Sequence, residues 1–201
     1  NMITSSSQDS RGNWTYDKDL SGLLALCDAL PALKNPIELD LSKCGLSVNG
    51  VNPVTKAIQV GAAVEALAIG GNPIGSEGGA TLLETIKTSK LKTIDIGKPL
   101  PLQEPYESDT LDLSNTQMDP GHVLLLSWWL GTEFSAVVNK VVLRGNEDVS
   151  RVSVLFPSLT KVTELDVSNC GLGASSMPEL AKLFRDATAA VVEAVDIGRN
   201  P

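Results

Sequence analysis

Aromatic and basic residues are scarce in this chain of 201 residues. Only 4% of the residues are aromatic although 42% are hydrophobic, so the core must be built from Leu, Val, Ile and Ala. Lys and Arg number 16 against 24 Asp and Glu, which gives a formal net charge of −8. Binding to phosphate groups requires concentrated Lys and Arg. The composition therefore argues against nucleic acid and anionic membranes as partners, and it is compatible with a basic protein partner.

Long apolar runs are also lacking. No run approaches the ~20 residues that a membrane-spanning helix needs, and residues 1–12 have no apolar signal-peptide core. Three cysteines, Cys27, Cys44 and Cys170, are an odd number and provide no disulfide framework. We interpret Cys44 and Cys170 as buried free thiols and Cys27 as a residue on a helix face. This favours a reducing compartment, and we expect an intracellular, cytoplasmic protein. The glycosylation sequon at residues 13–15 is weak evidence for secretion.

Residue sets for catalysis or metal binding are missing from the sequence. His122 is the single histidine, and no Ser/His/Asp set, HExxH motif, CxxC motif or phosphate-binding loop is present. The aspartates recur at regular intervals along the chain, and such a series does not converge around one ion. We therefore expect a non-enzymatic protein without cofactor or metal.

The chain does contain one recurring motif. Residues 162–172 read apolar-x-x-apolar-x-apolar-x-x-Cys-x-apolar, residues 37–46 are nearly a copy, and residues 64–74 follow the same pattern. The second apolar residue of the motif falls at Leu39, Leu67, Ile94, Leu111, Val141, Leu165 and Val195. The spacings between these positions are 28, 27, 17, 30, 24 and 30 residues. A unit of this size cannot bury its own apolar face, so the motif predicts repeats that stack on one another.

The motif, LxxLxLxx(N/C)xL, resembles leucine-rich repeats, and the usual spacing with alternating Asn and Cys is similar to the ribonuclease-inhibitor-like subclass. Relatives of that kind include the innate-immune nucleotide-binding receptors and the Ran GTPase-activating protein. The resemblance covers roughly residues 19–201. It implies an α/β solenoid, a horseshoe arc with about seven parallel strands on the concave face and helices on the convex face. It also implies a protein-interaction or scaffold module; two alternatives are a structural subunit buried within a large multiprotein assembly and a GTPase-activating-type regulator.

We divide the chain into a flexible polar leader, residues 1–16, and a leucine-rich-repeat domain, residues 17–201. Patterns of apolar residues predict helices over 17–30, 53–63, 76–90, 119–135 and 175–190, and a short helix or turn over 149–156. The first helix, capped by Asp17 or Asp19, is expected to form part of an N-terminal cap. The last repeat stops in mid-motif after Asn200, so we expect an open end that more of the protein or another subunit covers.

The polar residue at the turn of each repeat is predicted to hold the turn backbone. Asn72, Asn146 and Asn200 stand at this position and can hydrogen-bond main-chain groups, and Cys44 and Cys170 fill it as small buried residues. Where Pro99 and Thr116 stand there, the pattern does not predict such bonding.

Aspartate occupies the position between the two inward apolar residues in five of the seven strands: Asp40, Asp95, Asp112, Asp166 and Asp196. Neighbouring strands lie ~4.8 Å apart, so these carboxylates are expected to form a column on the concave face. Like charges at that spacing are unfavourable unless hydrogen bonds or a cationic partner compensate them. One interpretation is an acidic groove for a basic protein, as the likeness to the ribonuclease inhibitor implies. The other is a generic structural feature; Lys140 and Arg144, beside a gap in the column, would neutralise part of it.

The short spacing after Ile94 marks an irregular region, residues 97–135. Residues 97–108 carry three prolines, and we expect an extended connection with no helix there. Two interpretations of this segment are open. Its apolar side chains contact a partner from the rim of the arc, or the segment is what a functionally neutral deletion left behind. These side chains are Leu100, Leu102 and Tyr106.

The helix that follows is apolar all round, whereas a surface helix has a polar face. Its adjacent residues Trp128 and Trp129 have two interpretations. They form an exposed docking site, since Trp is enriched in binding hot spots, or they fill the gap that the missing helix leaves.

Overall fold

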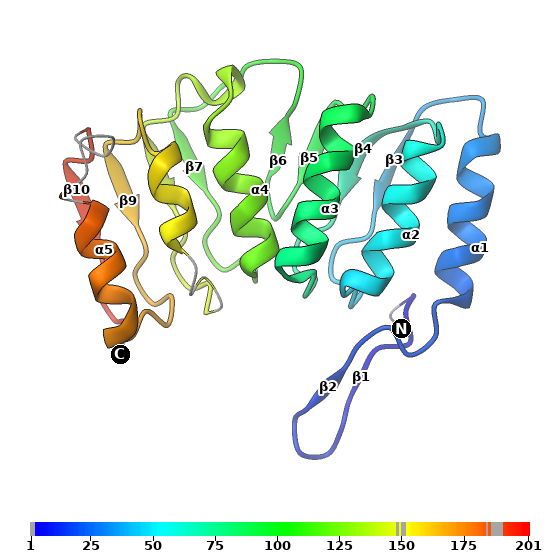
Figure 1. The fold of residues 1–201 in the computed structure, drawn as a ribbon, viewed down its shortest axis with the longest axis horizontal. Coiled ribbons are helices and arrows are strands. Elements are labelled where there is room, and N and C mark those ends of the chain that lie inside the picture. The colour runs from blue at the N-terminus through cyan, green and yellow to red at the C-terminus, as the bar shows by residue number, and fades with distance from the viewer. Residues whose placement is uncertain (1–2, 148, 150–151, 184, 186–190) are drawn as a thin grey trace.

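Strands and helices alternate along the chain in the computed structural model, which describes residues 3–147, 149, 152–183, 185 and 191–201. The helices form one layer in front of the strands, in a gently curved row from α1 to α5 (Figure 1). Strands form at all seven predicted positions: β3 (Ile37–Asp40), β4 (Val64–Ala68), β5 (Thr93–Asp95), β7 (Thr110–Asp112), β8 (Lys140–Val142), β9 (Glu164–Asp166) and β10 (Ala194–Asp196). The motif therefore predicted the strand register correctly.

These strands are divided between two sheets. β3, β4 and β5 are parallel, and β6 (Pro99–Pro101) pairs antiparallel with β5; β7, β8, β9 and β10 form a second, wholly parallel sheet. The expected run of about seven parallel strands is thus interrupted between β5 and β7. A parallel connection needs a crossover of a dozen or more residues, usually a helix. The spacing of 17 residues is about eleven shorter than the usual 28, or three helical turns, and residues 97–108 contain no helix, as predicted.

The helices are α1 (Ser21–Ala29), α2 (Val48–Gln59), α3 (Gly75–Thr88), α4 (Pro120–Leu130) and α5 (Met177–Leu183). Short 3₁₀ turns are η1 (Leu30–Ala32), η2 (Glu133–Ser135), η3 (Val152–Ser158) and η4 (Ala174–Ser176). The helix predicted over 175–190 is described only as far as Leu183, and residues 186–190 lie outside the described part. None of the described helices is long and apolar enough to cross a membrane.

The prediction for the second helix was wrong at its start. α2 begins before Pro53 and carries this proline in its interior. The carboxylate of Asp17 accepts hydrogen bonds from the backbone N–H of Ser47 (3.1 Å) and Gly50 (3.0 Å). The first N–H groups of a helix lack internal partners, so Asp17, expected to cap the first helix, instead satisfies the second. Asp19 accepts from the backbone N–H of Ser21 at the start of α1 (2.9 Å).

A β-hairpin lies within the segment for which we expected a flexible leader. β1 (Ser7–Gln8) and β2 (Trp14–Thr15) pair antiparallel and project from the row of helices (Figure 1). At its base, Thr4 is fully buried, and its hydroxyl donates to the carbonyl of Cys44 (3.0 Å), while that of Ser6 donates to the carbonyl of Gly45 (3.0 Å). Hydrogen bonds therefore tie the hairpin to the loop after β3.

Buried asparagines connect successive repeats, as predicted. The amide of Asn72 donates to the carbonyls of Leu41 (2.7 Å) in the previous repeat and Ile69 (2.8 Å) in its own. Asn146 and Asn200 make the corresponding pairs of bonds. Thr116, which stands at the same turn position, also bonds the backbone: its hydroxyl donates to the carbonyl of Leu113 (2.7 Å).

The missing helix brings α3 and α4 into direct contact. A Cβ atom on Gly79 would lie 2.6 Å from the Cα of Gly121, so the two backbones touch at glycine. Beneath α4, Trp129 is fully buried, and its ring meets that of Tyr106 edge-on at 5.5 Å. Leu100 is also fully buried. Neither side chain is exposed to a partner in this structure, and for Trp129 the burial favours the interpretation that it fills the gap left by the missing helix.

Candidate functional site

The five strand aspartates share one local geometry. Each carboxylate accepts a hydrogen bond from the backbone N–H two residues later, at 2.8 Å (Asp40), 2.7 Å (Asp95), 2.9 Å (Asp112), 3.0 Å (Asp166) and 2.8 Å (Asp196). This bond turns the chain at the end of each strand and satisfies one N–H group of the turn. One oxygen of each carboxylate therefore has a structural role within its own turn.

The turn that follows has a second regular feature, which sequence reasoning missed. Three residues after the aspartate position, the backbone is left-handed in six repeats: Lys43 (φ 54°), Gly71 (68°), Asn115 (55°), Gly145 (74°), Asn169 (53°) and Arg199 (59°). Gly and Asn tolerate this conformation best. The recurrence of Gly and Asn at one register position was therefore the signal for this turn.

The second sheet carries the denser group of charges. The guanidinium of Arg144 lies 2.5 Å from the second oxygen of Asp166 and donates to the hydroxyl of Ser168 (3.1 Å). Interaction with Asp166 chiefly raises the pKa of Arg144, and Asp196 and Asp112 add to this effect. The guanidinium is therefore paired with Asp166, and two further carboxylates lie within electrostatic range of it. Lys140 is paired with Glu164 at 2.6 Å.

The strand pairing places these aspartates close together. Asp166 and Asp196 are register partners on adjacent strands, and Asp112 lies two strands away from Asp166, across Val142. In the first sheet, Asp40 and Asp95 are likewise separated by one strand, at Ala68. The predicted column is thus two groups, one in each sheet.

Hydrogen bonding lowers the pKa of three of these carboxyls. Bonds from the backbone and side chain of Ser42 lower the pKa of Asp40, and bonds from Ser114 lower that of Asp112. Burial raises the pKa of Asp166, but hydrogen bonds from Ser168 and Arg144 outweigh it, so the net shift is downward. The hydrogen bonds therefore favour the charged form of these three groups.

The remaining predicted contact residues of the irregular region are only half-buried. Leu102, Tyr106 and Trp128 pack against the core and keep part of their surface in solvent. Burial chiefly raises the pKa of the Tyr106 hydroxyl. They form at most a minor apolar contribution to a binding surface.

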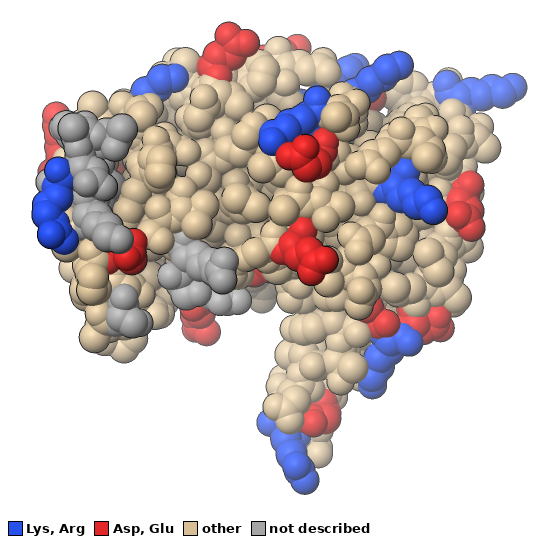
Figure 2. All heavy atoms as spheres, viewed as in Figure 1, with Lys and Arg blue, Asp and Glu red and all other residues tan. Residues whose placement is uncertain are grey.

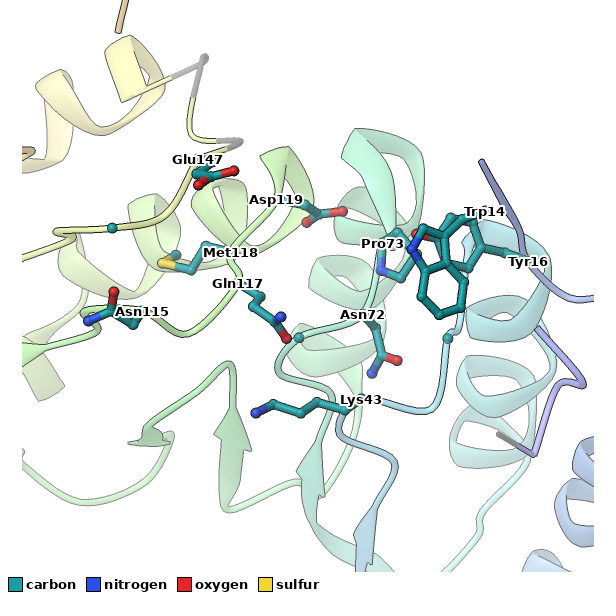
Figure 3. A pocket seen from close by; sticks show the side chains of 13 residues that line it. Trp14, Tyr16, Lys43, Asn72, Pro73, Asn115, Gln117, Met118, Asp119 and Glu147 are labelled. Carbon is teal, nitrogen blue, oxygen red and sulfur yellow. The ribbon is translucent and has the colours of Figure 1, made fainter. Parts of the chain in front are cut away.

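A groove that the sequence did not indicate lies at the loop ends of the strands, beside the hairpin. This loop-edge groove has a volume of about 620 Å³ and is lined by Trp14, Tyr16, Lys43, Gly45, Gly71, Asn72, Pro73, Asn115, Gln117, Met118, Asp119, Gly145 and Glu147. In Figure 3, Trp14 and Tyr16 lie at one side, Asn115 and Glu147 at the other, and Gln117 between them. The rings of Trp14 and Tyr16 are stacked, with centroids 5.7 Å apart and planes at 5°.

His122 has an acidic neighbour that the sequence reasoning did not pair with it. Its Nδ1 lies 2.8 Å from the carboxylate of Asp119, and its Nε2 lies 3.2 Å from the carbonyl oxygen of Ile69. The imidazole is fully buried. This pair caps the start of α4 and joins it to the loop after β4, and no ligand can reach the ring in this structure.

Lys, Arg, Asp and Glu are scattered over the helix layer in Figure 2, with both signs interspersed among the described residues. The described residues include no group of three or more His, Cys, Asp and Glu side chains able to hold a metal ion. The concentrated features are therefore the acidic groups on the strands and the loop-edge groove.

A family model described as leucine-rich repeat matches residues 64–83 and 158–181. The matched segments contain β4 with most of α3, and β9 with the start of α5. The chain thus contains leucine-rich repeats, a class of repeat that supports protein interaction. No curated protein matches the sequence.

Proposed function

We propose that this protein is a non-enzymatic protein-interaction module, a solenoid of the ribonuclease-inhibitor-like leucine-rich-repeat subclass, whose strand face binds a basic partner protein. The strand face here means the side of the sheets that carries Asp40, Asp95, Asp112, Asp166 and Asp196. The observation that carries the proposal is the pairing of Asp166 with Asp196 on adjacent strands, beside Arg144.

The geometry of each aspartate supports a role beyond turn formation. One carboxylate oxygen satisfies the backbone, and Asn or Ser would serve equally well for that purpose. In the described part of the chain, the second oxygen of Asp95 and of Asp196 has no hydrogen-bond partner. These oxygens are fixed by their neighbours and available to a cationic side chain.

Fixed charges of one sign promote recognition in a specific way. They steer an oppositely charged partner during encounter and set its register, and the effect weakens as salt rises. Arg144 in the midst of the acidic group adds selectivity, since it would repel a lysine placed directly upon it. The strand face therefore suits a partner whose basic side chains alternate with a hydrogen-bond acceptor.

The test uses partners captured by the purified protein and titrated by calorimetry. The double variant Asp112→Asn/Asp196→Asn keeps an oxygen for each backbone bond but removes two charges. We expect its Kd for a captured basic partner to rise on the order of tenfold, with a smaller salt dependence. The control, Asp28→Asn/Glu107→Gln, removes two exposed charges elsewhere and should bind like the native protein. Equal affinities for the two variants, or captured partners that are not basic, would disprove the proposal.

A further inference from the structure

The side chain of Arg144 occupies a site on the strand face that fits one edge of a guanidinium group. Its Nη2 lies 2.5 Å from the Oδ2 atom of Asp166, and its Nε donates to the hydroxyl of Ser168 at 3.1 Å. These two nitrogens stand side by side on the planar guanidinium, so two acceptors meet two adjacent donors. An ammonium group presents all its donors from one nitrogen and lacks this fork. We call Asp166 Oδ2 and the Ser168 hydroxyl together the guanidinium site.

The protein itself holds the two acceptors of this site. The other oxygen of Asp166, Oδ1, accepts from the backbone N–H of Ser168 (3.0 Å) and from its hydroxyl (2.6 Å). Asp166 is 8% exposed and Ser168 is 6% exposed. Asp166 also belongs to β9, which is paired on both sides, with β8 and with β10. The guanidinium site is therefore built from buried groups that the fold fixes in place.

The occupant of the site is much more exposed than the site. The side chain of Arg144 is 56% exposed, whereas that of Asp166 is 11% exposed. A solvated cation gains little from an ion pair, because water and salt screen the attraction. A buried carboxylate without a cation, in contrast, is unfavourable. The site therefore favours a guanidinium as its occupant, and little holds that of Arg144 there.

The contacts of Arg144 are not needed to join its strand to the next one. Backbone bonds on either side of it already connect the two, from the N–H of Leu143 to the carbonyl of Asp166 (2.8 Å) and from the N–H of Gly145 to the carbonyl of Ser168 (3.1 Å). A purely structural role for the side chain would duplicate these bonds. The pairing of β8 and β9 therefore persists when the side chain of Arg144 leaves the site.

A displaced Arg144 would still have carboxylates within reach of its charge. Asp196 and Asp112 both raise the pKa of Arg144, so both lie within electrostatic range of its guanidinium. The second oxygen of Asp196 has no hydrogen-bond partner in the described part of the chain. Arg144 and Asp196 also border one open cavity of about 360 Å³. The side chain thus has both space and a carboxylate to turn to.

We propose that Arg144 is an internal competitor, which occupies the guanidinium site until an arginine side chain of the basic partner protein replaces it. This role rests on the proposed function, since it names the residue type that the strand face takes from its partner. A partner must displace one cation in order to insert its own. Lysine replaces Arg144 less well than arginine does, because it lacks the fork that the site matches.

The experiment supplies the missing group to a variant that lacks it. Arg144→Ala empties the site, and the probes are ethylguanidinium and ethylammonium at equal ionic strength. The backbone N–H signal of Ser168 is followed by NMR in the ¹⁵N-labelled protein. We expect saturable shifts with ethylguanidinium in the variant, binding about tenfold weaker or more in the native protein, and weaker binding of ethylammonium to the variant.

Three results would overturn the proposal. Equal binding of both probes to Arg144→Ala would show that the site selects charge alone. Equal binding of ethylguanidinium by the native protein and the variant would show that Arg144 does not compete for the site. Absence of saturable binding by the variant would show that the acceptors hold a guanidinium only when it is attached to the chain.

Two further variants locate the probe. Arg199→Asn removes a guanidinium from the same cavity, and Asn suits the left-handed backbone at this position (φ 59°). The side chain of Arg199 makes no hydrogen bond or ion pair in the described part of the chain, so this variant should behave like the native protein. Arg144→Ala/Asp166→Asn keeps an oxygen for the N–H of Ser168 but removes the carboxylate, and it should lose ethylguanidinium. Binding retained by this double variant would place the probe elsewhere and refute the site.

Basic partners captured by the purified protein test the exchange itself. Arg144→Ala and Arg199→Asn each remove one positive charge, but only the first vacates the site. We therefore expect Arg144→Ala to lower the Kd of such a partner several-fold more than Arg199→Asn does. Equal effects of the two variants, or weaker binding by Arg144→Ala, would contradict competition by Arg144. An unchanged Kd for Asp112→Asn/Asp196→Asn refutes the proposed function instead, and the ethylguanidinium titration still decides whether the site exists.

Discussion

The indole Nε1 of Trp129 donates a hydrogen bond to the main-chain oxygen of Pro101 at 2.8 Å. These residues come from the two parts of the irregular region, the apolar helix and the proline-rich connection. The bond joins these two parts of the region to each other. β6 ends the first sheet as an antiparallel strand, and Trp129 on α4 is fully buried where it contacts the end of β6.

Replacement of Trp129 should therefore affect folding. We expect Trp129→Ala to lower the free energy of unfolding by about 3–5 kcal/mol, the range for large-to-small changes of buried aromatic residues. Urea denaturation monitored by circular dichroism measures this. Trp128→Ala, at the half-buried neighbour, is the control and should cost less. Equal losses for the two variants would show that Trp129 does not fill a gap.

The contact between α3 and α4 predicts intolerance to a single methyl group. In Gly79→Ala, the new Cβ would lie 2.6 Å from the Cα of Gly121, a backbone atom that cannot yield without a helix shift. We expect a loss of about 1–3 kcal/mol by overpacking, measured by urea denaturation. The matched change Gly173→Ala meets no atom within 4 Å and should be almost neutral. A neutral Gly79→Ala would show that the two helices can separate without cost.

The hydrogen bonds of the turn asparagines should contribute most to stability where the asparagine is completely buried. Asn146 is fully buried, donates to the carbonyls of Leu113 and Leu143, and accepts from the N–H of Met118 (2.9 Å). Asn146→Ala leaves the N–H of Met118 without a partner, at a cost of roughly 1–3 kcal/mol if it stays dry. The carbonyls of Leu113 and Leu143 lose one donor each and keep only Thr116 and Cys170. Asn200→Ala removes a similar set of bonds at a half-buried position, where water can replace them. Thermal unfolding should therefore show a larger fall in Tm for Asn146→Ala, and the reverse order would contradict this.

The sequence motif predicted those features of the fold that depend on local periodicity. Strand positions follow from apolar residues that alternate at period two, and the roles of Asn72, Asn146 and Asn200 follow from their fixed place after each strand. The cap that Asp17 provides for α2 could not be predicted in this way, because Asp17 and its partner Gly50 are 33 positions apart in the sequence. The antiparallel pairing of β6 with β5 could not be predicted from the repeat pattern either. The shortened spacing showed only that this segment has no helix.

The candidate sites were predictable to different degrees. The aspartates of the strand face were visible because they recur in register with Leu39 and its equivalents. The loop-edge groove was not, because its aromatic end comes from a segment outside the repeats and its polar residues come from several separate loops. The sequence did contain one signal for this groove, the two aromatic residues Trp14 and Tyr16 in a polar stretch. They stand two positions apart, and in a β-strand such residues project from the same face.

Acid should weaken the contact between the starts of α3 and α4 through Asp119. Burial raises the pKa of this carboxyl, but its interactions with the His122 side chain and hydrogen bonds from Gly75 and His122 outweigh burial, so the pKa is lowered. The unfolded chain, with an ordinary Asp pKa of about 3.9, therefore takes up the proton first as pH falls. The stabilisation by the carboxylate is present above that value and is lost as pH falls through the lower pKa of the folded state.

We accordingly expect the difference in free energy of unfolding between the native protein and Asp119→Asn to be largest at neutral pH and to shrink below about pH 4. Urea titrations at pH 7, 5, 4 and 3 measure it, with Asp28→Asn as an exposed control. Asparagine keeps an oxygen for the N–H groups of Gly121 and His122 but places its NH₂ group against the N–H of Gly75, so the variant removes that bond together with the charge. The dependence of the difference on pH separates the charge from the lost bond. A difference that stays constant across this range would show that the negative charge of Asp119 contributes nothing, and that the contact rests on its hydrogen-bond geometry alone.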